Sequence, residues 1–338
     1  MDRFRLATYN VALNRPHAGD LVAELNGEPS AQVSALLQVM ASVDAQVWVI
    51  NELDYDPEQR ALSALQAQLH RAGMDFPHVY TAPVNTGVPS GRDLVKQDEN
   101  QTQETPFGFG DFPGQYGMAV LSAFPLNVEH CRTFQTFLWR DMPSALLPAR
   151  PDGSAFYTDD DLAVLRLSSK SHWDLPVALP CGLCHLLISH PTPPAFDGPE
   201  RRNVCRNHDE IRFWVDYING ASYMTDDRGH QGGLAPEQAF IVAGDLNASP
   251  TGGDSQPGAI SSLVNHSAIH TLRPLSDRGD DLTARWRLRA DYVLPSTQVP
   301  VIDTGVFWPG PGSPLNTAVE QASDHRPVWI DITVPDRL

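Results

Sequence analysis

Lysine is almost absent from this chain, and positive charge as a whole is scarce. Only two of the 24 basic residues are lysines, Lys96 and Lys170, and the 338 residues carry a formal net charge of −17. Such acidity opposes the many phosphate contacts of a broad, non-specific grip on duplex nucleic acid. It leaves room for a local arginine pocket that binds one or two phosphates. A nucleic-acid partner is therefore disfavoured but stays open.

Long apolar runs are also missing. No stretch of the sequence approaches the length that spans a membrane. The first residues lead directly into a strand-like run, without the apolar segment of a signal peptide. We expect a soluble protein, cytoplasmic as the sequence is written, or extracytoplasmic or secreted if a signal peptide was removed. We also expect a monomer.

Cysteine is scarce as well, with four residues in the chain, too few for a disulfide scaffold in a chain of this length. The segment Cys181-Gly182-Leu183-Cys184-His185 matches the attachment pattern of c-type haem. It runs directly into Leu186-Leu187-Ile188, which is typical of a buried strand, so haem is disfavoured. A redox-active pair or a single disulfide stays open, and buried, unreactive thiols are favoured.

The order of the expected elements indicates an α/β fold. Apolar spacing predicts helices over 31–43, 57–69, 200–218 and 257–265. Strands are predicted over 5–11, 45–50, 116–122, 183–189, 240–243, 300–308 and 326–333. Four further strands, over 128–134, 144–149, 161–168 and 176–179, have no helices between them, which favours antiparallel pairing. The alternation in Arg285-Trp286-Arg287-Leu288-Arg289-Ala290 predicts a half-exposed strand.

The chain contains no internal repeat and no clear linker, which favours one domain over 1–338. Residues 83–115 form a long insertion rich in glycine, proline, asparagine and aspartate. A loop of this length inside a compact domain is usually functional or mobile. We interpret it as a substrate-facing insertion, with a flexible excursion as the alternative.

The stretch Phe240 to Pro250 is the most informative part of the sequence. A short apolar run stops abruptly in Gly244-Asp245-Leu246-Asn247, and Pro250 prevents a simple continuation of the strand. Asp245 and Asn247 are two residues apart and therefore on the same side of an extended chain. An Asx turn would explain them equally well in isolation. The same arrangement recurs at other predicted strand ends, which favours a functional site.

Taken together, the polar residues at strand ends suit the hydrolysis of a phosphate ester with a hard cation. Carboxylate oxygens bind Mg²⁺, and a further carboxylate can orient or deprotonate an attacking water. Histidine and asparagine can donate hydrogen bonds to the charge that develops on the phosphorus oxygens. The residues of this set are Asn10, Glu52, His190, Asp245, Asn247, Asp291, Asp324 and His325.

These motifs, in this order, resemble the endonuclease/exonuclease/phosphatase superfamily, which includes pancreatic deoxyribonuclease, apurinic endonucleases, sphingomyelinases and inositol phosphatases. The segments that carry the resemblance are Asn10, Asn51-Glu52-Leu53, Ser189-His190-Pro191, Gly244-Asp245-Leu246-Asn247, Asp291-Tyr292 and Ser323-Asp324-His325. The resemblance spans residues 5 to 333. It implies a four-layer α/β/β/α sandwich of two mixed, mostly antiparallel β-sheets flanked by helices.

The resemblance also implies a role for each residue. Glu52 would be the principal metal ligand, assisted by Asn10 and Asp324. Asp245 would activate the water, and Asn247 would hold the phosphate. His190 and His325 would stabilise the pentacovalent phosphorus, with His325 oriented by Asp291. The implied cofactor is Mg²⁺, with Mn²⁺ or Ca²⁺ as substitutes.

The sequence departs from the family pattern at positions that bear on the substrate. Leu121-Ser122-Ala123-Phe124-Pro125 lacks the basic residue usual in this turn, and no long basic insertion is present. The tyrosine that some family nucleases place near the phosphate has only two candidates, Tyr116 and Tyr157. Arg287 and Arg289 in the arginine row, together with Arg202, are candidate contacts for substrate phosphate. A solvated face of an edge strand is the alternative for the row.

The function favoured by the sequence is that of a Mg²⁺-dependent phosphoesterase acting on a mono- or diester by direct attack of water. A small-molecule or lipid-linked ester is preferred because of the net charge. A metal-dependent DNA or RNA nuclease is the alternative. A non-catalytic binding module on the same fold is a second alternative, which the intact acidic and histidine positions oppose.

Overall fold

The computed structural model describes residues 3–96 and 103–334, and its larger sheet has six strands. Their order is β12–β13–β1–β2–β6–β3, in which β1 and β2 run parallel and every other neighbouring pair is antiparallel. The strands are β1 (Arg3–Leu13), β2 (Val47–Leu53), β3 (His78–Tyr80), β6 (Met118–Ser122), β12 (Val301–Val306) and β13 (Val328–Thr333).

The second sheet has five strands in the order β11–β10–β9–β8–β7. Only β9 and β10 run parallel in it. The strands are β7 (Arg132–Thr133), β8 (His172–Leu179), β9 (Gly182–Ser189), β10 (Phe240–Asp245) and β11 (Asp291–Pro295). A separate short hairpin pairs β4 (Pro89–Arg92) with β5 (Thr105–Pro106).

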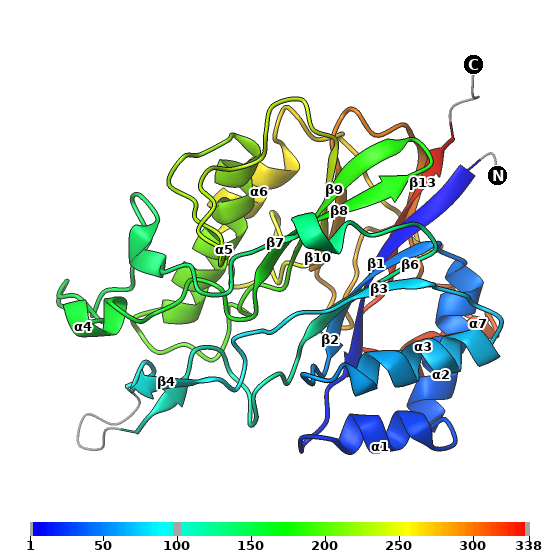
Figure 1. The fold of residues 1–338 in the computed structure, drawn as a ribbon, viewed down its shortest axis with the longest axis horizontal. Coiled ribbons are helices and arrows are strands. Elements are labelled where there is room, and N and C mark those ends of the chain that lie inside the picture. The colour runs from blue at the N-terminus through cyan, green and yellow to red at the C-terminus, as the bar shows by residue number, and fades with distance from the viewer. Residues whose placement is uncertain (1–2, 97–102, 335–338) are drawn as a thin grey trace.

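Helices cover the outer faces of both sheets (Figure 1). The first sheet carries α1 (Asp20–Asn26), α2 (Ala31–Val43), α3 (Arg60–Arg71) and α7 (Leu315–Ala322). The second carries α5 (Arg202–Ile218) and α6 (Pro257–Val264). Three further elements are short helical turns: η1 (Val128–His130), η2 (Trp139–Asp141) and α4 (Asp159–Leu162). The predicted α/β fold of two mixed, mostly antiparallel sheets flanked by helices is thus confirmed, and the order of layers in Figure 1 is consistent with the four-layer sandwich.

Two apolar clusters explain this layering. One contains the side chains between the sheets together with those under α2 and α3, with the large residues Trp48 and Trp173 fully buried. The other lies between the second sheet and α5, where Trp214 and Tyr217 are fully buried. Strands that are covered on both faces read as continuous apolar runs, which is why β2 and β10 were visible in the sequence.

The cysteines are free thiols, and Cys131 and Cys184 are buried. Burial raises the pKa of the Cys131 thiol to about 12, which keeps it in the unreactive protonated form. The preference for unreactive thiols is confirmed at these two positions. Within the described residues, no helix has the length and apolar character needed to cross a membrane.

Three strand predictions are wrong. Residues 144–149 are irregular, and 161–168 contain the end of α4, whose capping box at Thr158 fixes a helical turn there. Residues 285–290 form a turn rather than a strand. Period-two alternation also arises in a loop whose apolar residues face the protein, so the pattern does not require pairing. The helices α1 and α7 were not predicted.

The insertion at 83–115 is partly ordered by its own hairpin, and 97–102 lie outside the described residues. Its end is attached to the segment that follows β2, because the Tyr55 amide donates to the Gly114 carbonyl at 2.8 Å. Tyr116 then donates its backbone amide to Asp54 Oδ1 at 3.1 Å. This places the end of the insertion beside the strand that carries Glu52. Its contact with substrate stays a prediction.

The strand directions bring the polar residues to one edge of both sheets. The parallel pairs β1–β2 and β9–β10 end at this edge, which places Asn10, Glu52, His190 and Asp245 there. β11 and β13 run antiparallel to their neighbours and begin at the same edge, so Asp291 and His325 join them. Loops at such an edge are positioned by rigid strands, which favours a functional site.

Candidate active site

The backbone at the ends of β2 and β10 adopts conformations that side chains rarely allow. Glu52 and Asn247 have φ values of 61° and 51°, in the left-handed region. Gly244 has φ 146°, and a Cβ at this position would collide with the carbonyl oxygen of Ser189. Only glycine fits here, which allows β10 to approach β9 closely just before Asp245. Strained positions of this kind cluster at functional sites.

Asp245 is the centre of the hydrogen-bond network. Its Oδ2 accepts a hydrogen bond from Asn10 Nδ2 at 3.1 Å and lies 3.4 Å from His190 Nε2 and 3.6 Å from His325 Nε2. Its Oδ1 accepts from the Asn247 amide at 2.9 Å. Burial alone would raise the pKa of Asp245, but the two histidines and Asn10 lower it well below its usual range. The carboxylate is therefore ionised although it is fully buried.

His325 lies between two carboxylates. Its Nδ1 is 2.8 Å from Asp291 Oδ2, which also accepts from Thr283 Oγ1 at 2.7 Å. Burial lowers the pKa of His325, but the charges of Asp291 and Asp245 outweigh burial and raise it to about 10. The imidazole is thus protonated at neutral pH and can donate a hydrogen bond from Nε2.

His190 has a different environment from His325. It is fully buried, and its Nδ1 has no hydrogen-bond partner among the described residues. Burial and the charge of Lys170 lower the pKa of His190, against the opposing effect of Asp245. One histidine of the pair is therefore kept neutral and the other charged, so they can take different roles in proton handling.

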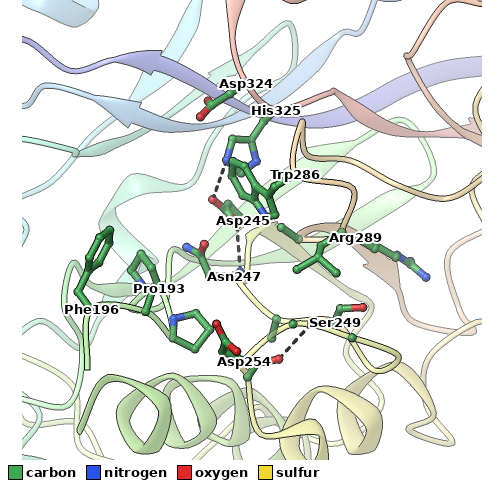
Figure 2. Close-up of a pocket in the computed structure, with 18 of the residues that line it drawn as sticks. Pro193, Phe196, Asp245, Asn247, Ser249, Asp254, Trp286, Arg289, Asp324 and His325 are labelled. Atoms are coloured by element: carbon green, nitrogen blue, oxygen red, sulfur yellow. Dashed lines mark hydrogen bonds and ion pairs between the residues drawn. The ribbon is translucent and has the colours of Figure 1, made fainter. Parts of the chain in front are cut away.

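Glu52 offers a carboxylate whose hydrogen bonds come from neutral amide groups. Its Oε1 accepts from Asn10 Nδ2 at 3.0 Å and its Oε2 from Asn14 Nδ2 at 3.3 Å. Within the described part of the chain, no basic side chain forms an ion pair with this carboxylate. Glu52 lines the same pocket as Asp324, whose carboxylate is shown beside His325 in Figure 2. Carboxylates of this kind are ligands that suit Mg²⁺.

A second group could also hold an ion by distance alone. Ligand atoms of Asp245, Asp291 and His325 all lie within 4.8 Å of one another. Both nitrogens of His325 already face these carboxylates, and the raised pKa keeps a proton on each nitrogen. A protonated imidazole cannot bind a metal. The cluster therefore suits a charged histidine better than a cation.

An open pocket of about 410 Å³ begins at these residues (Figure 2). Its lining includes Glu52, Asp245, Asn247 and His325. The remainder comes from Asp324 and from the loops 193–196, 248–255 and 286–290. A pocket of this volume is typical of a site for a small molecule.

The three arginines proposed as phosphate contacts do not gather at the pocket. Arg202 Nη1 lies 2.5 Å from Glu200 Oε1, and Arg287 Nη2 lies 3.7 Å from Asp280 Oδ2. Neither residue lines the pocket, so the structure does not support either as a phosphate contact. Arg289 does line it, but its guanidinium extends away from the pocket over the Tyr292 ring (Figure 2).

Several residues near the site were missed by the sequence analysis. Lys170 is buried at the start of β8, and its ammonium senses the charges of Glu210, Glu52 and Asp245. Asn14 and Thr283 hold Glu52 and Asp291 in place. The rarity of lysine in this chain was the one signal that could have singled out Lys170.

Of the two candidate tyrosines, Tyr116 is the one near the edge of the sheets that carries the candidate site residues. Its pKa is raised by burial and by the charges of Glu52, Asp111 and Asp54. Tyr157 instead packs against Trp139 and Phe156 in the apolar cluster that lies between the second sheet and α5.

Comparison with known proteins identifies the family. The Endonuclease/Exonuclease/phosphatase family model matches residues 7–325. The chain belongs to this family. Members of the Endonuclease/Exonuclease/phosphatase family are hydrolases that act on phosphate esters, and the family generally uses a divalent metal. No curated protein matches the chain.

Solved structures of this family share the fold. An endonuclease/exonuclease/phosphatase from Beutenbergia cavernae is 18% identical with a TM-score of 0.58, covering 99% of this chain and 72% of that one. A family protein from Leptotrichia buccalis is 13% identical with a TM-score of 0.54, covering 97% of this chain and 99% of that one. At these identities the similarity concerns the fold alone.

Proposed function

We propose that this protein is a Mg²⁺-dependent phosphoesterase that hydrolyses a phosphate mono- or diester by direct attack of water. One observation carries the proposal. A buried Asp245 carboxylate lies within 3.6 Å of the Nε2 atoms of His190 and His325, beside a Glu52 carboxylate that forms no ion pair with a basic side chain in the described residues. This arrangement supplies an acceptor for a water molecule and donors for a phosphate in one place.

We assign the cation to Glu52, with Asn10 and Asp324 beside it. Two observations support this assignment: the Glu52 carboxylate forms no ion pair with a basic side chain in the described residues, and it lines the same pocket as Asp324. When bound, Mg²⁺ would neutralise charge on the phosphate oxygens and so make phosphorus more electrophilic.

The protein side chains then divide the remaining work. Asp245 accepts a hydrogen bond from the attacking water and orients it toward phosphorus. Its low pKa makes it a weak base, so orientation is its larger contribution in the ground state. Asn247, held by its bond to the Pro191 carbonyl at 3.1 Å, positions a phosphate oxygen.

Charge on the phosphorus oxygens increases in the transition state and needs fixed donors. Protonated His325 donates from Nε2, and Asp291 holds its ring and its charge. His190, as a neutral ring, donates from Nε2 on the other side of Asp245. Preorganised donors of this kind act mainly on the transition state and therefore raise kcat.

A small ester is favoured over a large nucleic acid. The net charge of −17 and the outward direction of the Arg289 guanidinium leave little positive surface for a chain of phosphates. The pocket volume also suits a small molecule.

The test is a substrate panel with Mg²⁺ or Mn²⁺ and an EDTA control. It contains bis(p-nitrophenyl) phosphate, p-nitrophenyl phosphate, inositol phosphates, sphingomyelin, plasmid DNA and an apurinic duplex. We expect metal-dependent cleavage of a small ester with intact plasmid. Nicked plasmid with inert small esters would replace the proposal by a nuclease. Inactivity on every ester would leave a binding module.

A further inference from the structure

The pocket continues beyond the catalytic residues into a largely apolar chamber, which we call the Trp286 pocket. Its walls are Pro193, Pro194, Phe196, Trp286, Leu288 and Ala290. Two of them, Phe196 and Trp286, are among the few large apolar side chains that the fold leaves exposed, at 93% and 49%. Solvent-exposed aromatic rings beside a polar centre mark a place where a ligand covers them.

Trp286 joins the chamber to the catalytic residues. Its ring packs edge-on against His325, with the ring centres 4.9 Å apart and the planes at 84°. A group attached to a phosphate at His325 would therefore lie next to the indole. Phe196 stands across the pocket in Figure 2, after the rigid pair Pro193-Pro194. The two rings give the chamber apolar surface at opposite sides.

The charges of the lining disfavour a second anionic group. Among the described residues of the lining, Arg289 is the only basic side chain apart from His325. Its side chain is 11% exposed, packs over Tyr292 at 4.5 Å and points toward Asp281. The lining also includes Asp254 and Asp324, which repel anions. A substituent with its own phosphate or carboxylate would meet these charges without a partner.

We propose that the Trp286 pocket binds an uncharged, flat, apolar group carried by the scissile phosphate, such as an aromatic ring. This deepens the proposed function and rests on the phosphate lying at Asp245 and His325. Apolar walls favour a ring through burial, and the two exposed aromatic side chains add edge or face contacts. The substrate class is thus an ester of one phosphate with an aromatic or similarly flat group.

Binding of phosphonates tests the pocket without any turnover, because their carbon–phosphorus bond is not an ester. Calorimetric titration in Mg²⁺ would compare phenylphosphonate, methylphosphonate and (2-trimethylammonioethyl)phosphonate. We expect phenylphosphonate to bind roughly tenfold more tightly than methylphosphonate, since a partly buried ring retains part of its transfer free energy. Equal affinities would overturn the proposal. Tightest binding of the trimethylammonio compound would also overturn it, in favour of a cation site formed with Asp254.

Two variants test whether the preference for phenylphosphonate over methylphosphonate arises in the Trp286 pocket. Trp286→Ala and Phe196→Ala should each reduce the advantage of phenylphosphonate to about two- to threefold. Ile302→Ala is the control, because Ile302 on β12 is 57% exposed and does not line the pocket. It should keep the full advantage. A preference that survives in both pocket variants would place the ring elsewhere and contradict the proposal.

The same titrations separate this inference from the proposed function. If phenylphosphonate is preferred and no ester is hydrolysed, the pocket stands and the phosphoesterase proposal fails. If small esters are hydrolysed and the phosphonates bind equally, the phosphoesterase proposal stands and the pocket inference fails.

Discussion

Asp291→Asn isolates the charge that keeps His325 protonated. In the wild type, His325 Nδ1 lies 2.8 Å from Asp291 Oδ2. The substitution preserves an acceptor for this hydrogen bond but removes the negative charge. Burial lowers the pKa of His325, whereas Asp291 and then Asp245 raise it to about 10. An adjacent opposite charge shifts a pKa by about 1–3 units, so the variant should have a His325 pKa of roughly 7 to 9.

The sign of the effect on activity follows from the role of His325 as a protonated donor. Activity is present below the pKa of His325 and is lost as the pH rises through it. At about pH 9 the variant should therefore lose roughly two- to a hundredfold in kcat relative to the wild type, and much less near about pH 6.

The assay is kcat against pH for wild type and Asp291→Asn, with the His325 pKa followed by NMR. Asp280→Asn is the control, because Asp280 pairs with Arg287 outside the pocket. Profiles of wild type and Asp291→Asn that stay parallel across the range would refute the reasoning, since the charge of Asp291 would then have no effect on the active protonation state.

Three further predictions follow from the same contacts. Asp245→Asn and His325→Ala should each abolish turnover and leave the unfolding transition unchanged, which steady-state kinetics and thermal melts check; near-normal kcat in Asp245→Asn would exclude its assigned role. Lys170→Met removes a buried cation that interacts with Glu52, so the variant should bind Mg²⁺ about three- to tenfold more tightly by titration. The control Lys96→Met breaks the ion pair with Asp161 and should not change the affinity for Mg²⁺. Burial lowers the pKa of His172 to about 4, so its contribution to stability is present above its unfolded pKa of about 6.5 and is lost as the pH falls toward 4. Over that pH range, urea unfolding should show the wild type losing up to about 3 kcal/mol more free energy of unfolding than His172→Gln. Equal pH dependence of the free energy of unfolding in the two proteins would contradict this.

The gathering of the candidate site residues at one edge of the sheets was predictable because these residues carry local signals. Asp245 follows a short apolar run that stops at glycine, and His325 comes just before the apolar run that forms β13. Sequence order and strand direction then bring such strand ends together at one edge of the sheets. The resemblance added the pairing of particular residues, such as His325 with Asp291, which spacing alone does not specify.

Other features could not be predicted because they depend on long-range placement. The alternation from Arg285 to Ala290 is compatible with a strand or a turn, and only the partners Glu320, Asp280 and Asp281 show where the arginines point. Lys170 carries no local motif, and its proximity to Glu52 results from the packing of the two sheets, because Lys170 precedes β8 of one sheet and Glu52 lies on β2 of the other. Phe196 has a loop sequence that gives no indication of its exposure.

The central claim is that water attacks phosphorus directly at the Asp245 centre. The most direct test is a single turnover of bis(p-nitrophenyl) phosphate with Mg²⁺ in heavy-oxygen-labelled water, followed by mass spectrometry of both products. We expect one labelled oxygen in p-nitrophenyl phosphate, none in p-nitrophenol, and no reaction in Asp245→Asn. Unlabelled p-nitrophenyl phosphate after the first turnover would show that an enzyme oxygen attacked phosphorus, and label in p-nitrophenol would show attack at carbon; either result would contradict the account.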